Sequence, residues 1–352
     1  MLQMNTTITA RFSVFATCFA FCALFLSPVI SSGAVGPGPF YISGYAQGTT
    51  YHLTYFAKDS LVSQAEIDGL LNQLDSSLSV YKPYSLISRF NLAGCGEIKM
   101  DRHMKAVIKK AMEIGKASDG MFDITVYPLV KAWGFGNTKV QHLPDAARID
   151  SLLLGVGPDK FFVNNNMLIK RHPAVQIDLD GIAQGYSVDV VADFLEGRHI
   201  RNYLIEIGGE IRVKGFKQPG NQPFQIGVES PAENSTDDPI MERILSLKSG
   251  GLTTSGNYRK YFKMNGRMMS HLIDPKTGYS FQNEMIAVTV LAKDAITADG
   301  YDNVFMGMGY KRSLEFLKRI KGMEAYFIYH KNDGSVADTA SAGFYKHIEQ
   351  KR

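Results

Sequence analysis

The chain has 352 residues, of which 45% are hydrophobic and 20% are charged, and its formal net charge at pH 7 is +4. These values are ordinary for a soluble globular protein, and the length suits two core-forming units or one large one. The positive charge is small and is spread along the chain without a long block of Lys and Arg. The composition therefore gives no support to a nucleic-acid-binding function.

The N-terminal segment differs from the rest of the chain. Polar residues up to Arg11 precede an almost wholly apolar stretch, residues 12–30, and small residues follow it. This order is typical of a secretory signal, and the stretch is also long enough for an uncleaved membrane anchor or a buried helix. We expect residues 1–35 to be a signal peptide or an N-terminal anchor. Removal of this segment would leave Cys95 as the one cysteine, which excludes an internal disulfide.

Several later segments show apolar residues at helical spacing. The first runs from Ser63 to Leu78 and begins with a capping box, because Glu66 follows Ser63 by three residues. We expect further helices over residues 101–118, from Gly181 onward, and over residues 298–308 and 312–320.

Short runs rich in β-branched and aromatic residues make up much of the remainder. Residues 161–170, FFVNNNMLIK, predict a hairpin around an Asn-rich turn. Further strands are expected at residues 175–179, 203–207, 210–215, 224–229, 242–248, 258–264, 285–292 and 325–330.

The order of these elements favours an α+β fold with largely antiparallel sheets and packed helices, because strands follow one another directly in the second half. We expect one domain over residues 36–345 and a tail over residues 346–352. Turn residues between about 136 and 160 predict a boundary between two lobes of that domain.

Motifs of the common catalytic classes are missing from the sequence, including CxxC, HExxH, GxSxG and a Gly-rich nucleotide loop between a strand and a helix. Enzymatic chemistry must then come from scattered turns and carboxylates, and four stretches qualify. The first is residues 122–136, an apolar strand or loop with Asp123 near its start and a packed Trp133 near its end.

The second stretch, residues 176–189, predicts a strand that ends in Asp178 and Asp180, a turn at Gly181 and then a helix. Carboxylates at a helix N-terminus are stabilised by the helix dipole. The same corner would also place backbone groups and an acid around a ligand.

The third stretch, residues 250–262, leads through a turn to residues 270–280. Ser, Thr and Gly amides beside Arg259 could hold a phosphate, although ordinary turn chemistry explains them equally well. His271 lies at the start of the second part and is either a structural histidine or a general base, because its pKa is naturally near neutral.

The fourth stretch, residues 297–309, holds the oxygen donors Asp299, Asp302 and Asn303. Their spacing places these side chains on one face of a helix. Such hard donors suit magnesium or calcium, and a capped helix start is the alternative explanation.

Taken in order, these stretches resemble the ApbE family, the FAD:protein FMN transferases. The resemblance runs from about Gly44 to Gly309 and rests on AQGTTY, LSVYKPYSLISRFN, DGMFDITVYPLVKAWGFG, IDLDGIAQGYSVD, IEIGGEI, TTSGNYRKYF, SHLIDPKTG and TADGYDN. It implies an α+β protein that holds FAD and a magnesium ion in a cleft between lobes. It also implies transfer of FMN from FAD to a Thr or Ser hydroxyl of a partner, through a phosphoester.

The resemblance also implies roles for individual residues. For the metal ion it implies the backbone carbonyl of Gly181 together with Asp299, Asp302 and Asn303. The positions implied for FAD are Gln47, Tyr81, Met121, Phe122, Asp123, Asp178, Gln184 and Ile273.

Three positions depart from the family pattern. Gln47 stands where Met is usual, Gln184 where Lys or Glu is usual, and Asn303 where Thr is usual. Asn303 keeps an oxygen donor, so we expect the metal site to survive, whereas Gln184 removes a charge from the cleft.

The resemblance further implies an exported enzyme on the periplasmic side of the bacterial inner membrane. Its acceptor would be a flavoprotein subunit of a membrane redox complex. His271 is the candidate general base and Asp274 its rival. Two other functions stay open, namely an FAD pyrophosphatase that uses water in place of the protein hydroxyl, and a periplasmic FAD-binding protein without turnover.

Overall fold

The computed structural model describes residues 36–94, 96–136, 140, 142–230, 240–257, 261–264 and 267–349. The predicted signal or anchor segment, Cys95 and Arg259 lie outside these residues. Within the described part of the chain, no helix combines the length and the apolar character needed to cross a bilayer. The chain from Gly36 onward groups into one compact unit, and the predicted division into two lobes stays a prediction.

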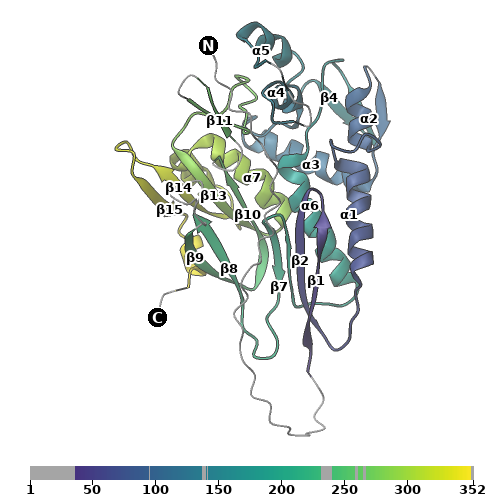
Figure 1. Ribbon diagram of the computed structural model, residues 1–352, viewed down its shortest axis with the longest axis vertical. Coiled ribbons are helices and arrows are strands. Elements are labelled where there is room, and N and C mark those ends of the chain that lie inside the picture. Colours follow the sequence, from purple (N-terminus) through teal and green to yellow (C-terminus); the bar gives the residue numbers. More distant parts are fainter. Residues whose placement is uncertain are drawn as a thin grey trace. The chain divides into compact units, whose positions relative to one another are not determined.

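An eight-stranded antiparallel sheet forms the centre of the fold, with the strand order β1-β2-β6-β7-β10-β13-β14-β15 (Figure 1). Its strands are β1 (Gly38–Ala46), β2 (Thr49–Ala57), β6 (Tyr203–Ile207), β7 (Glu210–Lys214), β10 (Ser249–Gly256), β13 (Met285–Ala292), β14 (Glu324–His330) and β15 (Val336–Ala340). All eight residues of β13 are buried, as expected for a continuous apolar run with both faces of the sheet covered.

Helices cover one face of this sheet and enclose the largest hydrophobic cluster. They are α1 (Gln64–Leu78), α3 (Arg102–Ala117), α6 (Asp180–Gly197), α7 (Ala295–Met308) and α8 (Tyr310–Leu317). On the other face, a second cluster packs the hairpin of β8 (Phe224–Ser230) and β9 (Ile240–Leu247), with the short helix η2 (Phe344–His347), against the sheet. The predicted α+β fold with antiparallel sheets is confirmed.

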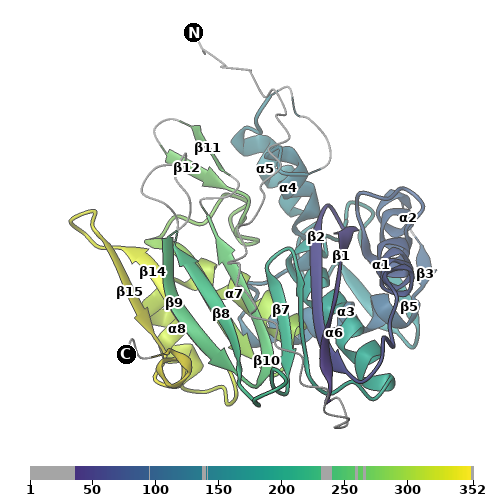
Figure 2. The same cartoon turned by 60° about the horizontal axis from the view of Figure 1, so that its bottom comes forward.

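Smaller elements lie beyond one end of the main sheet or beside the helices (Figure 2). A third hydrophobic cluster forms around α4 and α5 and includes Trp133 and Ile273. These elements are α2 (Leu86–Leu92), the three-stranded sheet of β3 (Glu97–Lys99), β5 (Met167–Lys170) and β4 (Phe161–Asn164), the short helix η1 (Ile124–Val126), α4 (Tyr127–Ala132), α5 (Ala146–Leu153), and the hairpin of β11 (Tyr261–Met264) and β12 (Arg267–Ser270).

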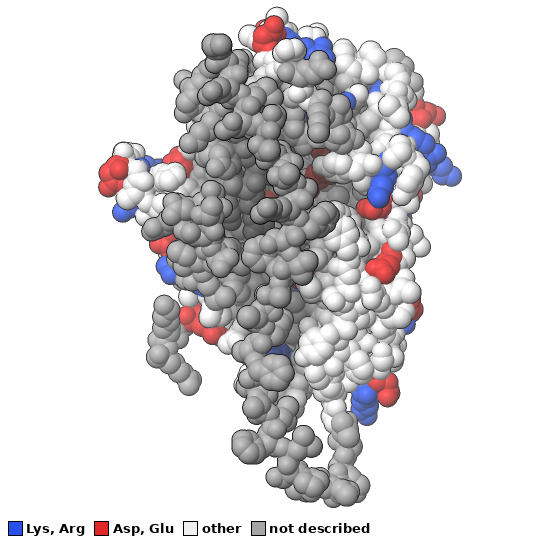
Figure 3. Space-filling view, viewed as in Figure 1, with Lys and Arg blue, Asp and Glu red and all other residues white. Residues whose placement is uncertain are grey.

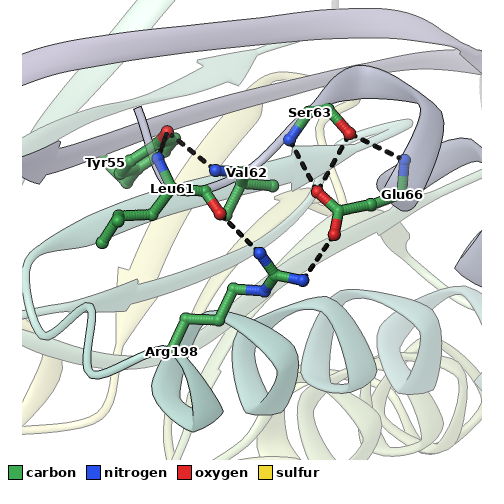
Figure 4. A network of polar contacts seen from close by, with 6 residues as sticks. All are labelled: Tyr55, Leu61, Val62, Ser63, Glu66 and Arg198. Carbon is green, nitrogen blue, oxygen red and sulfur yellow. Dashed lines mark hydrogen bonds and ion pairs between the residues drawn. The ribbon is translucent and has the colours of Figure 1, made fainter. Parts of the chain in front are cut away.

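A polar network joins β2 and the start of α1 to the end of α6 (Figure 4). The capping box is confirmed, because Ser63 and Glu66 exchange side-chain and backbone hydrogen bonds. The hydroxyl of Tyr55 accepts a hydrogen bond from the amide of Leu61 at 3.2 Å. Arg198 donates to the carbonyl of Leu61 and forms an ion pair with Glu66. These contacts orient α6, whose opposite end carries the candidate site.

The predicted strand at residues 175–179 is wrong, because this segment pairs with no strand. The backbone groups of Ile177, at its centre, are satisfied by a side chain instead. Asn91 on α2 accepts from the amide of Ile177 at 2.7 Å and donates to its carbonyl at 2.8 Å. The amide of Asp178 donates to the carbonyl of Ile124 at 2.7 Å. The apolar residues of this segment therefore indicate that it is buried, although it does not pair with a neighbouring strand.

The stretch 122–136, expected as a strand or loop, contains η1 and α4. Asp123 caps η1 by accepting from the amide and the hydroxyl of Thr125 at 2.8 and 2.6 Å. Pro128 lies in the first turn of α4, where its missing N–H costs nothing. Trp133 is buried as predicted, and its ring nitrogen donates to the carbonyl of Gly278 at 2.7 Å.

Charges of both signs are interspersed over the described part of the face in Figure 3, in keeping with the small net charge.

Candidate active site

The four residues predicted for a metal ion come together where α6 meets α7. The side-chain amide nitrogen of Asn303 lies 3.2 Å from the carbonyl oxygen of Gly181 and 3.0 Å from that of Asp299. It also lies 2.9 Å from the Oδ1 atom of Asp302. Gly181 and Asn303, which are 122 positions apart in sequence, thus lie in contact. The side-chain amide nitrogen of Asn303 lies among three oxygen atoms.

Gly181 permits this convergence through its small size. Its φ of −82° and ψ of 16° depart from helical geometry at the start of α6. A Cβ atom at this position would lie 3.2 Å from the amide nitrogen of Asn303 and 3.5 Å from the ring of Phe122. The first of these contacts is tighter than ordinary van der Waals packing, so a side chain here would require the amide of Asn303 to shift by a few tenths of an ångström.

The carboxyls of Asp299 and Asp302 are almost completely buried, with 4% and 3% exposure. Burial raises the pKa of Asp299 to about 7, against a hydrogen bond from the amide of Gly185 at 2.8 Å that favours the charged form. Burial also raises the pKa of Asp302 well above its ordinary value, and the charges of Asp299 and Glu210 raise it further. Two acids buried this close are costly to ionise without a cation.

The donor set fits a hard divalent cation. No three His, Cys, Asp or Glu side chains lie within reach of one metal ion in the described part of the chain. A metal here would therefore also need carbonyl and amide oxygens. The cluster offers the carbonyl oxygen of Gly181, whereas Asn303 presents its amide nitrogen and would have to turn its side-chain oxygen toward a metal ion. Oxygen ligands of this mixed kind suit magnesium or calcium.

A second group surrounds the N-terminus of α6. The pKa of Tyr81 is raised by burial and by the neighbouring carboxylates of Asp180 and Asp178. The same causes raise the pKa of Tyr127 to about 12. Both phenols therefore stay protonated at neutral pH and can donate hydrogen bonds. The Oδ1 atom of Asp178 accepts from the amide of Asp180 at 2.9 Å, which fixes this corner.

The predicted segment Met121–Asp123 lies beside the metal group. Phe122 is buried and its ring faces Gly181. Met121 reaches the end of α7, because a Cβ atom on Gly307 would lie 2.9 Å from its methyl group. Burial raises the pKa of Asp123, whose carboxyl caps η1. Phe122 therefore lies beside Gly181, while Tyr81 and Asp178 lie at the N-terminus of α6; their role in FAD binding stays a prediction.

Gln47 and Gln184 lie beside α6 at a neighbouring point. Gln47 forms the β1–β2 turn and donates from its amide to the hydroxyl of Ser187 on α6 at 2.9 Å. The side-chain amide of Gln184 lies over Gly208, where a Cβ atom would come within 2.2 Å of its nitrogen. The two neutral amides thus lie between α6 and two hairpin turns, the β1–β2 turn for Gln47 and the β6–β7 turn for Gln184.

His271 and Ile273 lie in the segment that packs on α4 and α5. Ile273 is buried in the cluster around these helices. The ring of His271 is half-buried and packs edge-on against Phe135, with the ring centres 6.3 Å apart. Its assignment as general base stays a prediction.

Ser249–Gly256 form β10. Residues 249–252 pair with β7 on one side, and residues 251–256 pair with β13 on the other. Residues 253–256 therefore pair on the β13 side alone, and a phosphate-binding role for their amides stays a prediction. Arg259 lies outside the described residues.

Sequence reasoning missed Thr253, Glu210 and Asp189. Thr253 on β10 and Glu210 on β7 lie next to Asp302, where the Thr253 hydroxyl lowers its pKa and the Glu210 charge raises it. Asp189 on α6 accepts hydrogen bonds from the first turn of α7. Asp189 follows Gly181 and Gly185 at intervals of four residues, which places all three on one face of α6. This spacing was the one sequence feature that could have predicted a role for Asp189.

Comparisons with known proteins identify the relatives of this chain. The model of the ApbE family matches residues 47–327. The chain is 36% identical over 322 residues to the FAD:protein FMN transferase of Haemophilus influenzae, which covers 88% of this chain and 92% of that protein. It is 37% identical over 280 residues to the FAD:protein FMN transferase of Vibrio cholerae, over 78% of this chain and 83% of that protein.

Solved structures share the fold as well. The flavin transferase ApbE from Vibrio cholerae superposes with a TM-score of 0.79 at 32% identity, over 88% of this chain and 99% of that one. The apo form of the Pseudomonas stutzeri flavinyl transferase ApbE superposes with a TM-score of 0.80 at 30% identity, over 91% of this chain and all of that one. This chain therefore belongs to the ApbE family.

Proposed function

We propose that this protein transfers the FMN half of FAD to a Thr or Ser hydroxyl of an acceptor protein and releases AMP. The observation that carries the proposal is the meeting of Gly181, Asp299, Asp302 and Asn303 between α6 and α7. It is supported by the relatives named FAD:protein FMN transferase that match most of the chain.

These four residues would hold a magnesium ion. The bound ion would withdraw charge from the pyrophosphate of FAD and orient its oxygens. None of these four residues has a basic side chain that could balance the charge of Asp299 and Asp302. The two buried carboxylates would therefore keep their negative charge only when the cation is bound. Few protein ligands leave room for phosphate oxygens, as is usual for magnesium at phosphates.

FAD would lie along Tyr81, Asp178 and the segment Met121–Asp123, with Gln47, Gln184 and Ile273 as further contacts. The protonated phenol of Tyr81 would donate a hydrogen bond to the dinucleotide. Asp178 would accept from a ribose hydroxyl or a base amine. The ring of Phe122, which faces Gly181, would exclude water from the metal side of the pocket.

In the transfer, the acceptor oxygen bonds to the phosphorus on the FMN side and the bond from that phosphorus to the AMP oxygen breaks. The proton of the hydroxyl must pass to a base. Our candidate for the base is His271, a histidine with a half-buried ring, and Asp274 is the rival. Asp274 accepts from the amide of Lys276 at 2.8 Å and from the hydroxyl of Thr277 at 3.1 Å, which fixes the position of its carboxylate.

We further propose export to the periplasmic side of the inner membrane, either soluble or anchored by residues 1–35. The support is the apolar N-terminal segment of the sequence. The acceptor would then be a flavoprotein subunit of a membrane redox complex.

The test is incubation of the purified protein with FAD and magnesium, with and without a candidate acceptor, followed by mass spectrometry of the acceptor. Transfer predicts a mass gain of one FMN less one water, together with AMP. Equal amounts of free FMN with and without the acceptor would instead indicate a pyrophosphatase. FAD that stays intact under both conditions would indicate a binding protein and would contradict the proposal.

A further inference from the structure

Helices α6 and α7 meet in an antiparallel register marked by three polar contacts. The carbonyl of Gly181 faces Asn303, the amide of Gly185 donates to Asp299, and Asp189 accepts from the amide of Ala295. Each contact lies four residues further along α6 and four residues further back along α7. Residues four apart share one face of a helix, so the three contacts form a single ladder between the helices.

The last contact of this ladder lies one helical turn before Asp299 on α7 and is made by both oxygens of one carboxylate. The two carboxylate oxygens of Asp189 accept from the amides of Ala295 and Ile296 at 3.0 and 2.9 Å. These amides belong to the first turn of α7, which has no intrahelical acceptor for them. Asp294, the N-cap residue of α7, accepts separately from the amide of Thr297 at 3.1 Å.

The helix start therefore has two carboxylates of different origin. Asp294 belongs to the segment that precedes α7 and follows that helix wherever it lies. Asp189 belongs to α6 and ties α7 to it. This difference allows the effect of capping α7 to be separated from the effect of holding it against α6.

Arg212 on β7 strengthens the tie between the helices. Its Nε atom lies 3.6 Å from the Oδ1 atom of Asp189, and the two side chains are 19% and 15% exposed. Its guanidinium also donates to the carbonyl of Lys293, which precedes the N-cap of α7. Arg212 thus contacts both the carboxylate and the segment that this carboxylate holds.

We propose that Asp189 is a positioning residue that fixes α7 against α6 and so sets the spacing between the Gly181 carbonyl and Asp299, Asp302 and Asn303. This inference rests on the proposed metal centre. Gly181 lies on one helix and the three side chains lie on the other, so relative movement of the helices changes the cage. Loss of groups that orient metal ligands typically weakens metal binding about 10- to 100-fold.

The test measures binding of Mn²⁺ to the purified protein by electron paramagnetic resonance, without FAD, in the wild type and in Asp189→Asn and Asp294→Asn. Burial raises the pKa of Asp189 to about 6, so pH 8 keeps the wild-type carboxylate charged. We expect the dissociation constant to rise at least tenfold in Asp189→Asn and to stay within about twofold of the wild type in Asp294→Asn. Urea unfolding with EDTA should show almost no loss of stability in Asp294→Asn, because Asn caps a helix about as well as Asp. Asp189→Asn should show a small loss, because one of the two amides held by Asp189 loses its acceptor oxygen.

A third variant, Asp189→Glu, separates position from charge. It keeps the carboxylate but adds one methylene between α6 and α7, so Mn²⁺ binding should again weaken. Wild-type affinity in Asp189→Glu would overturn the positional role, and so would equal weakening in Asp189→Asn and Asp294→Asn. Failure of the wild type to bind Mn²⁺ would instead overturn the proposed metal centre itself.

Discussion

Gly185 provides a direct test of how closely α6 and α7 must approach. A Cβ atom at this position would lie 2.4 Å from the carbonyl oxygen of Ala295 and 2.7 Å from the Cβ atom of Asp299. Ordinary contact begins at 3.4 Å, so Gly185→Ala must displace α7 by about 1 Å, the difference between 3.4 and 2.4 Å. Overpacking of this kind costs about 1–3 kcal/mol, and the higher helix propensity of Ala offsets about 1 kcal/mol of it.

The same displacement affects the candidate site. The hydrogen bond from the amide of Gly185 to Asp299 is 2.8 Å long, and an added 1 Å would lengthen it to about 3.8 Å, beyond hydrogen-bond range. A shift of about 1 Å in a catalytic group can cost about 100-fold in rate. We therefore expect Gly185→Ala to lower FMN transfer about 100-fold while the protein stays folded at 25 °C.

Gly197→Ala is the matched control, because Gly197 ends the same helix and an added Cβ atom would meet nothing within 4 Å. Urea unfolding followed by the fluorescence of Trp133, the one tryptophan of the chain, reports stability, and acceptor labelling reports transfer. Gly197→Ala should match the wild type in transfer and equal or slightly exceed it in stability. If Gly185→Ala behaved like Gly197→Ala in both assays, the close approach of the helices would have no functional importance.

Three further predictions concern the site residues. Asp299→Asn should abolish magnesium-dependent transfer and Mn²⁺ binding, and residual binding in a Mn²⁺ titration would assign the site elsewhere. The pKa of Asp299 is 3.8 when unperturbed and about 7 in the folded protein, so the folded state holds more protons between these values. In EDTA, Asp299 should therefore lower the free energy of unfolding as the pH rises across this window, by up to about 1.4 kcal/mol per pH unit for one proton, and its own contribution should level off above pH 7. Asp302, whose pKa is also raised, adds a fall of the same sign. Urea titrations of the wild type and of Asp299→Asn, in which the contribution of Asp299 should vanish, measure it. His271→Ala should lower the rate of transfer about 10²- to 10³-fold without changing Mn²⁺ affinity, and unchanged transfer rates would show that another group takes the proton.

Local patterns in the sequence were sufficient for much of the fold. The capping box at Ser63, the hairpin at residues 161–170 and the buried strand at residues 285–292 each depend on neighbours in sequence. The shared face of Asp299, Asp302 and Asn303 was equally predictable, because helical spacing alone places them together. The family resemblance then named their partner, Gly181, which no local pattern indicates.

The sequence by itself therefore determined the helices and strands and the oxygen donors that each of them carries. It could do so because hydrophobic periodicity and helix capping depend on residues only a few positions apart. Only the tertiary structure decided how those donors meet. The bonds of Asp299 to Gly185 and of Asp189 to Ala295 join residues 114 and 106 positions apart. Residues 175–179 likewise look like a strand, yet a distant side chain, Asn91, satisfies the backbone groups of Ile177 at their centre. Such contacts form when buried polar groups find partners during packing, and this depends on the whole fold.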